Sequence, residues 1–337
     1  MSLSRRSSLR LLAAAAGGAA LAPLVACQRG NRRRGGAGPW RLGILQYVQV
    51  PAVDVTREGV LQGLALHGFQ PGQNLQVLLR QADGSPARCR SLARELVAAD
   101  VDLLVAIGTP ALQAAIAAAS GQLPIVFCYC ANPWGAGAGG SATQHQAQVT
   151  GTVTTTAVEE LLRVARQLVP NLHQVGLLYN PAEPNSSFEA ELLAQAVAAQ
   201  QLQLVREAVT GAADLPEAFA QLQRQGMQAL IKVEDYVVLQ GFDQLAALAL
   251  QARLPLLAEE PDDAGVSGCL AVVGWRSIQD GQRAGELASQ ILRGTAPASL
   301  PIQPPGDPGL WLNRDTARRL GIPLPASLVE RATAVLG

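Results

Sequence analysis

Short apolar segments alternate with amphipathic segments along most of the chain. Residues 101–107 and 124–127 are almost entirely apolar, as expected of strands that are buried on both faces of a sheet. Residues 86–98 carry apolar side chains at helical spacing, and residues 111–119 form a second predicted helix. Further strands are predicted at residues 42–45 and 75–79. This alternation predicts an α/β protein in which helices wrap a parallel sheet.

The same order of elements begins again in the second half of the chain. Residues 174–181 (QVGLLYNP) echo residues 41–51, because in both a buried strand leads to a proline-bearing loop and then to a helix. Strands and helices then follow at residues 202–205, 215–224, 229–233, 238–252 and 255–258. The repeat predicts two Rossmann-like lobes that are joined near residues 149–151.

The first 39 residues do not read as part of either lobe. Arg5, Arg6 and Arg10 form a basic head, and an apolar segment too short for a convincing membrane span follows. It ends in Leu24-Val25-Ala26-Cys27, which resembles a bacterial lipobox whose cysteine, Cys27, is lipidated. The residues around Arg5 also resemble a twin-arginine export motif, and a plain basic head is an equal alternative. We therefore expect an exported, membrane-anchored lipoprotein that faces the periplasm or the cell exterior.

Composition narrows the function further. The net charge is zero, whereas a nucleic-acid binder normally shows a basic field, so we expect no nucleic-acid partner. The cysteines after the lipobox are Cys89, Cys128, Cys130 and Cys269. No second closely spaced Cys/His pair completes a zinc pattern. Buried free thiols are therefore expected, with a disulfide as the alternative outside the cytoplasm.

Two such lobes suggest where a ligand binds. In open parallel sheets, ligands bind beyond the carboxyl ends of the strands, and clefts between domains are preferred ligand sites. A two-lobed, exported α/β protein is most simply one that captures a ligand by closing like a hinge.

Seven segments carry a resemblance that spans about residues 42–325. They are GILQYVQVPAVDVTREG, LVAIGTPALQA, PIVFCYCANPWGAG, VTGT, VGLLYNPAEPNS, PLLAEEPDD and GWRSIQDGQRAGE. In this order they resemble the substrate-binding proteins of ABC transporters, in the group that takes up tryptophan or tyrosine. The resemblance implies the type I periplasmic-binding fold, with three crossings between lobes, a ligand in the cleft, and permease and ATPase subunits as partners.

The chain departs from that family pattern at several cleft positions. Arg276 in Gly274-Trp275-Arg276 replaces the usual Asp, Glu234-Asp235 replaces Asp-Asn, and Ala131-Asn132-Pro133 stands where Thr-Asp-Pro is more common. Aromatic amino acids therefore cannot be carried over as the ligand from the family alone.

The expected domains follow from the pattern and the resemblance together. Residues 1–27 form the signal peptide with Cys27, and residues 28–39 form a flexible basic and glycine-rich tether. Lobe 1 comprises residues 40–149 and about 276–300, and lobe 2 comprises residues 150–275 and about 301–337.

Candidate ligand-binding residues lie at the ends of the predicted strands. In the first lobe, Gln46 and Tyr47 end the first strand, with packing of the tyrosine on its neighbours as the alternative. Thr109 begins a helix and would suit an anion or simply cap that helix. Tyr129 and Asn132 end the next buried strand and follow it.

The second lobe offers more charged candidates. Tyr179, Asn180 and Ser186 repeat the arrangement at Thr109, again with capping as the alternative. The remaining candidates are Glu234, Asp235, Asp262, Trp275 and Arg276. A carboxylate among them could hold a ligand amine or guanidinium, or lie at the surface. Arg276 could bind an acidic ligand group or form a salt bridge at the hinge with Glu234 or Asp262.

The resulting hypothesis is a monomeric solute-binding lipoprotein that delivers a small molecule to an ABC importer. An amino acid or a derivative, with an aromatic or apolar side chain favoured, would use both the anionic and the cationic candidates. We expect no enzymatic activity, because no nucleophile elbow, metal motif or phosphate loop is present, and we expect no cofactor and no metal. The alternative is a ligand-sensing subunit that signals to a membrane sensor kinase.

Overall fold

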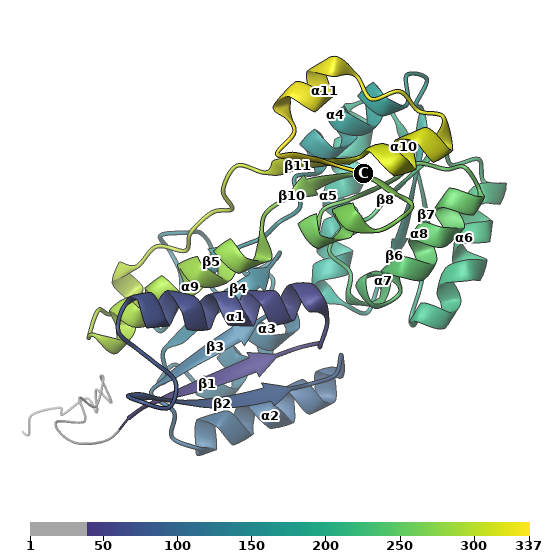
Figure 1. Cartoon of the computed structure of the whole chain (residues 1–337). Helices are drawn as coiled ribbons and strands as arrows, with labels where there is room; N and C mark the ends of the chain where they lie inside the picture. The colour runs from purple at the N-terminus through teal and green to yellow at the C-terminus, as the bar shows by residue number, and fades with distance from the viewer. Residues whose placement is uncertain (1–38) are drawn as a thin grey trace, which may run out of the picture. The chain divides into compact units, whose positions relative to one another are not determined.

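The computed structural model describes residues 39–337, so the predicted signal, Cys27 and residues 28–38 of the expected tether lie outside the described residues. A five-stranded parallel sheet forms from the first part of this range, in the order β2-β1-β3-β4-β5 (Figure 1). Its strands are β1 (Trp40–Gln46), β2 (Leu75–Gln81), β3 (Leu103–Ile107), β4 (Ile125–Cys130) and β5 (Val149–Val153). All residues of β3, β4 and β5 are buried, which agrees with the continuous apolar runs.

The connecting helices start where proline or a capping side chain allows. They are α1 (Pro51–Leu66), α2 (Pro86–Ala98) and α3 (Thr109–Ala119). Each has proline in its first turn, and the Ser85 side chain also caps α2 by accepting a hydrogen bond from the backbone N–H of Arg88.

A seven-stranded sheet forms from the second part of the chain, in the order β12-β11-β10-β9-β8-β6-β7. Its strands are β6 (Gln174–Tyr179), β7 (Gln203–Ala208), β8 (Ala229–Ile231), β9 (Leu256–Ala258), β10 (Cys269–Gly274), β11 (Gly309–Asn313) and β12 (Ala334–Leu336). Only the β10–β11 pair is antiparallel. The prediction of an α/β protein built on two parallel, helix-wrapped sheets is thus confirmed apart from this one antiparallel pair of strands.

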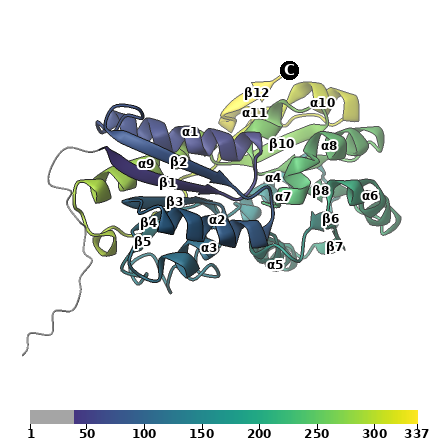
Figure 2. The ribbon, with the colours of Figure 1, turned by 90° about the horizontal axis from the view of Figure 1, so that it is seen from below.

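Helices and short 3-10 turns connect and cover the second sheet (Figure 2). The helices are α4 (Val158–Leu168), α5 (Pro184–Ala199), α6 (Leu215–Arg224), α7 (Tyr236–Gln240), α8 (Phe242–Gln251), α10 (Arg314–Leu320) and α11 (Ala326–Arg331). The turns are η1 (Ala212–Asp214), η2 (Pro261–Gly265) and, beside β5, η3 (Pro297–Ser299).

The single helix expected at residues 238–252 is wrong, because α7 and α8 are separate. Gly241 lies between them with a non-helical backbone, and a Cβ added there would lie 2.2 Å from Leu215 Cδ1. The glycine therefore permits the close approach of Leu215.

The chain passes between the two sheets three times. It leaves the first sheet after β5, returns to it after β10 with α9 (Ser277–Leu292), and goes back to the second sheet with β11. The join expected near residues 149–151 falls within β5, so the first crossing follows Val153.

Helix α9 lies along α1 through a contact made by glycines, and both views show the two helices side by side (Figures 1 and 2). A Cβ added at Gly59 or Gly63 would lie 2.3 or 2.4 Å from a backbone oxygen of α9. One added at Gly281 or Gly285 would lie 2.0 or 2.4 Å from a backbone oxygen of α1. Only glycine at these four positions allows the backbones to approach so closely.

The four cysteines of the described region are buried and free, as expected for thiols within a core. Strand β4 is irregular at Tyr129, whose φ is +49°, and its pairing with β5 shifts between Phe127 and Cys130. Cys128 and Cys130 thus flank a distorted residue of a buried strand.

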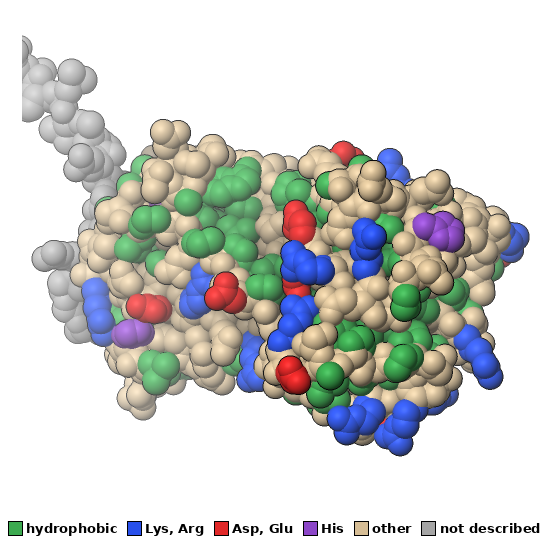
Figure 3. All heavy atoms as spheres, turned by 90° about the horizontal axis from the view of Figure 1, so that it is seen from above, with side chains coloured by type: hydrophobic (Ala, Val, Ile, Leu, Met, Phe, Trp, Pro, Cys, Tyr) green, Lys and Arg blue, Asp and Glu red, His purple; other side chains and the backbone are tan. Residues whose placement is uncertain are grey.

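Charge on the described surface is mixed. On the face in Figure 3, Lys and Arg side chains lie among acidic and hydrophobic ones, with no single basic field. Within residues 39–337, no helix combines the length and apolar character needed to cross a lipid bilayer.

Replacing Gly281 by alanine should destabilise the protein by about 1–3 kcal/mol, the usual cost of overpacking. The added methyl group would meet the backbone oxygen of Thr56 at 2.0 Å, so the two helices would have to separate. Chemical denaturation measures the effect, with Gly265→Ala as the control, because a Cβ at Gly265 meets nothing within 4 Å. Equal stabilities of the two variants would contradict this role of the glycine contact.

Candidate functional site

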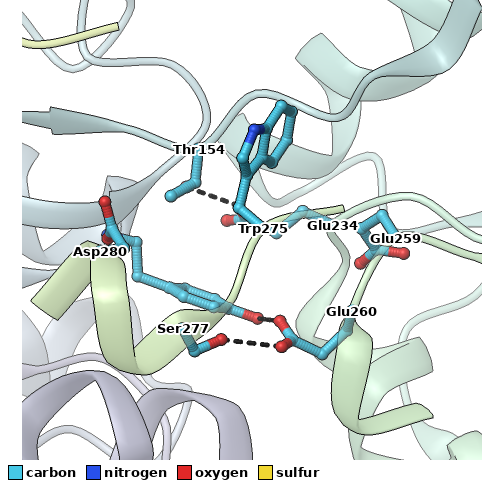
Figure 4. Close-up of a pocket in the computed structure, with 8 residues that line it drawn as sticks. Thr154, Glu234, Glu259, Glu260, Trp275, Ser277 and Asp280 are labelled. Carbon is cyan, nitrogen blue, oxygen red and sulfur yellow. Dashed lines mark hydrogen bonds between the residues drawn. The ribbon is translucent and has the colours of Figure 1, made fainter. Parts of the chain in front are cut away.

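A small acidic cavity lies where residues attached to the two sheets meet (Figure 4). Its volume is about 20 Å³, which is room for about one water molecule. The residues that line it are Tyr129, Thr154, Glu234, Glu259, Glu260, Trp275, Ser277 and Asp280. Tyr129 belongs to β4 of the first sheet, and Ser277 and Asp280 lie in the first turn of α9. Glu234, Glu259 and Glu260 follow strands β8 and β9 of the second sheet.

Glu260 connects the two sides of this cavity. Its Oε1 accepts a hydrogen bond from Ser277 Oγ at 2.7 Å, and its Oε2 accepts one from the Tyr129 hydroxyl at 3.1 Å. Glu260 is buried, and burial, with a smaller contribution from nearby Asp263, raises its pKa to about 8. The carboxyl group of one lobe is therefore held by two hydroxyl groups of the other.

Tyr129 is held at both its backbone and its side chain. Its backbone N–H donates to Asp280 Oδ2 at 2.8 Å, while its hydroxyl reaches Glu260. A positive φ is uncommon for a bulky residue and persists only where the surroundings enforce it. The side chain of Tyr129 lines the cavity, where its hydroxyl donates to Glu260 Oε2.

Glu234 is buried with weak hydrogen bonds. Its Oε1 accepts from the Tyr236 hydroxyl at 3.4 Å and its Oε2 from Thr154 Oγ1 at 3.5 Å, both long for O–H donors. Burial, followed by the neighbouring carboxylates of Glu189, Glu259 and Glu260, raises the pKa of Glu234 well above its usual range.

The buried cation beside the cavity is Lys232, which follows β8. Its Nζ lies 2.7 Å from Glu259 Oε1 and 3.0 Å from Asp263 Oδ2. Burial lowers the pKa of Lys232, but the carboxylates of Asp263 and Glu259 outweigh that effect and raise it, so the lysine is charged. Lys232 was not among the residues expected at the site, since one lysine after a short apolar strand carries no distinctive signal.

A larger cavity of about 390 Å³ adjoins the same glutamate. Its lining comes from the start of α1, from α7 and α8, and from η2. The residues that line it are Gln49, Val50, Pro51, Ala52, Leu239, Gln240, Phe242, Asp243, Glu260, Asp262, Asp263 and Val266. Glu260 lines both cavities. The volume of the outer cavity is the one that matches a small organic ligand.

Four of the predicted site residues line these two cavities. Tyr129, Glu234 and Trp275 line the inner one, and the exposed Asp262 lines the outer one. The Trp275 ring is oriented by a hydrogen bond of 2.6 Å from its Nε1 to the backbone oxygen of Gly306.

The candidates at the end of β1 and near α3 lie in other contacts. Gln46 donates to Asp54 Oδ1 at 2.8 Å, and the hydroxyl of the buried Tyr47 donates to the backbone oxygen of Gly84 at 2.7 Å. Thr109 Oγ1 lies 3.3 Å from Cys130 Sγ and accepts from the backbone N–H of Asn132 at 3.4 Å. The structure therefore places these residues in hydrogen bonds that hold loops to strands.

The candidates near Asp235 form a second such network. Asp235 Oδ1 caps α7 through the N–H of Val238, and its Oδ2 accepts from the N–H of Asn180 and from Ser186 Oγ, each at 2.6 Å. The Tyr179 ring faces the guanidinium of Arg206 at 5.6 Å. Asp235 is buried, so the alternative of a surface carboxylate does not describe it. Ser186 lies within α5, and its hydroxyl bonds to Asp235 and to the N–H of Asn180 rather than capping that helix.

Arg276 is exposed and does not line either cavity. Among the described residues, no ion pair joins it to Glu234 or Asp262, and Lys232 makes the buried ion pairs instead. The sequence analysis also missed Thr154, Glu259, Glu260, Ser277 and Asp280. Two of the quoted segments, PLLAEEPDD and GWRSIQDGQRAGE, contain all but the first of them.

Within the described range, no group of three or more His, Cys, Asp and Glu residues is arranged to hold a metal ion. The residues that line the two cavities offer hydrogen bonding, charge and aromatic contact.

Comparison with known proteins identifies relatives over most of the chain. Residues 41–336 match the family described as ABC transporter substrate binding protein. A tyrosine-binding protein of Clostridioides difficile (strain R20291) is 25% identical over 279 residues, which cover 83% of this chain and 80% of that protein.

Solved structures agree with this match. A conserved domain protein from Vibrio cholerae O1 biovar El Tor is 30% identical, with a TM-score of 0.84, and the match covers 88% of this chain and 99% of that one. An ABC domain in complex with L-Trp from Streptococcus pneumonia is 24% identical, with a TM-score of 0.83 and coverage of 89% and 100%, and shares the fold. The resemblance stated from the sequence motifs and the type I periplasmic-binding fold are thereby confirmed.

The buried carboxyl groups should make the protein less stable as the pH rises from about 4.5 to about 8. Burial raises the pKa of Glu189 to about 8 from an ordinary value of 4.5, so in this window the folded state holds a proton that the unfolded state has lost. The unfolding free energy then falls by up to about 1.4 kcal/mol per pH unit for each such group.

Glu189→Gln should flatten this decline, because glutamine keeps an acceptor for the N–H of Thr156 but does not ionise. Denaturant unfolding between pH 5 and pH 8 measures the slope. Glu191→Gln, on the exposed side of the same helix, is the matched control and should keep the wild-type slope. Parallel pH profiles for both variants would show that Glu189 is not a buried neutral acid.

Proposed function

Because the chain belongs to the ABC transporter substrate-binding protein family, we propose that it captures a small molecule between its two lobes and delivers it to an ABC importer. The observation that carries the proposal is the lining of the inner cavity by residues attached to both sheets. A ligand held by both sides stabilises their approach, which is how a hinged binding protein converts ligand capture into a shape that a transporter recognises.

The proposed ligand is an amino acid or a derivative of one, with an aromatic or apolar side chain favoured. One relative carries the name tyrosine-binding protein, and one structural neighbour holds L-Trp. The rings of Tyr129 and Trp275 line the inner cavity and offer flat apolar faces. Its carboxylates offer partners for an amine, whereas Thr109 and Arg276, expected to hold an anionic end, do not line either cavity.

The proposed route of delivery includes a lipid anchor at Cys27 and contact with permease and ATPase subunits. Leu24-Val25-Ala26-Cys27 supports the anchor, and family membership supports the transporter partners. An anchored binding protein stays near the membrane that holds its permease, which raises the local concentration of loaded protein at the transporter.

Cys27→Ala should release the mature protein from membranes or leave an uncleaved precursor, because the mutated residue can no longer be acylated. Membrane fractionation and metabolic labelling with a fatty acid measure this outcome. Ala26→Gly, which keeps a small residue before the cysteine, is the control and should remain membrane-bound. A Cys27→Ala protein that fractionates and migrates as wild type would refute the lipid anchor.

A thermal-shift screen of amino acids and their derivatives should identify compounds that raise the melting temperature. A ligand at about 100 times its Kd stabilises the folded state by about 2.7 kcal/mol. Small-angle scattering with a hit should show a smaller radius of gyration, because the lobes close on the ligand. The proposal fails if no amino acid or derivative binds, and a saturating ligand that leaves the scattering unchanged would argue against hinge closure.

A further inference from the structure

The two cavities are lined by acidic residues and by no basic ones. Glu234, Glu259, Glu260 and Asp280 line the inner cavity, and the outer cavity adds Asp243, Asp262 and Asp263. Neither lining includes a lysine or an arginine. A ligand that enters this space therefore meets carboxyl groups, and no positive side chain lines the space with them.

The one buried cation nearby is already engaged. The Lys232 side chain is 1% exposed and bonds to Glu259 and Asp263, so it cannot also bind a ligand carboxylate without breaking those contacts. An anionic ligand group would be buried there without a free positive partner, which is costly.

Two carboxylate oxygens at the inner cavity have no hydrogen-bond partner among the described residues. Oε2 of Glu259 is buried and accepts no hydrogen bond from the described residues, although nine-tenths of this side chain is buried. Oδ1 of Asp280, which lines the same cavity, is also without a hydrogen bond. A buried, unpaired carboxylate oxygen is costly, and a donor supplied by a ligand would remove that cost.

Aromatic rings complete the surroundings of these oxygens. Trp275 and Tyr129 line the cavity together with Glu259 and Glu260. A cation is attracted to the face of an aromatic ring as well as to a carboxylate, and this pairing of groups is how proteins recognise organic amines.

We propose that the ligand of this site is a small organic cation, with more positive than negative charge, whose cationic nitrogen binds between Glu234, Glu259 and Glu260. A basic amino acid, an amine or a guanidinium compound has this chemistry. The inference rests on the proposed function, because it names the charge of the solute that the cleft captures. The nitrogen lies in the inner cavity, and the remainder of the molecule extends past Glu260 into the outer one.

Binding of a cation should release protons from the protein. Burial raises the pKa of Glu260 to about 8, so at pH 7 most of this carboxyl group holds a proton when no cation is present, and burial also raises the pKa of Glu234 well above its usual range. The charged and titratable groups that face them are Tyr129, Glu189, Lys232, Tyr236, Glu259 and Asp263. A bound cation favours the ionised carboxylates and lowers their pKa values.

The first experiment compares pairs of ligands that differ in net charge. L-Arginine and L-citrulline have the same shape and differ by a guanidinium against a neutral urea group, and tryptamine and L-tryptophan differ by a carboxylate. Isothermal titration should show at least about 10-fold tighter binding for the cationic member of a pair that binds.

The outcomes separate this inference from the proposed function. If citrulline or tryptophan binds as tightly as its cationic partner, the cation preference is refuted and the capture of amino acids stands. If none of the amines and amino acids in the wider screen binds, both are refuted.

The second experiment removes the carboxylates one at a time. Glu260→Gln and Glu234→Gln should each weaken the better cationic ligand by about 10- to 100-fold, the loss expected for one charge-assisted hydrogen bond. Titration at pH 7 in buffers of different ionisation enthalpy should also show fewer protons released by each variant. Glu191→Gln, whose carboxylate is exposed on α5, is the control and should bind as wild type.

Melting temperatures of the empty variants show whether they fold. Each glutamine variant should melt no lower than wild type, because it replaces a buried acid with a neutral group of the same size. Folded Glu260→Gln and Glu234→Gln proteins that bind the cation as tightly as wild type, with unchanged proton release, would overturn the assignment of the nitrogen to these carboxylates.

Discussion

The close contact between α1 and α9 is the constraint on which the site depends. Four glycines let the two helix backbones touch, and this contact holds α9 on the first sheet although the chain reaches it directly from β10 of the second. The first turn of α9 carries Ser277 and Asp280, so the same contact places a hydroxyl and a carboxylate at the cavity. The Asp280 carboxylate in turn holds the strained backbone of Tyr129 by accepting a hydrogen bond from the N–H of Tyr129.

Glu260 links that assembly to the second sheet, since both of its oxygens accept hydrogen bonds from residues of the first lobe. Such a carboxyl group responds to charge more strongly than an exposed one, because a buried carboxylate has little water to stabilise it. If the ligand is the proposed cation, it acts on the carboxyl group that itself joins the two lobes, so that ligand binding and closure would involve the same residue.

The predicted fold agrees with the structure wherever burial alone decides it. The apolar runs at β3 and β4 are stable only as strands that are covered on both faces. Pro86 after Ser85 marks the start of α2 in the sequence and in the structure. The single helix expected at 238–252 failed because the break at Gly241 reflects the packing of Leu215 from another helix. The candidate residues at strand ends also differ in their contacts because of packing by distant residues. Tyr129 lines a cavity, whereas Tyr47 packs against Tyr236.

The sequence by itself determined the class, the two-fold repeat of strands and helices, and the family, because these depend on local periodicity and on motifs read in order. Only the tertiary structure decided which polar residues meet. No sequence motif marks Lys232, Glu259 and Glu260. They form the charged centre of the site because β8 and β9 are neighbours in the sheet. Arg276 was expected to bind an acidic ligand group or to pair with Glu234 or Asp262, but its side chain is exposed and lines neither cavity, and no periodicity encodes that direction.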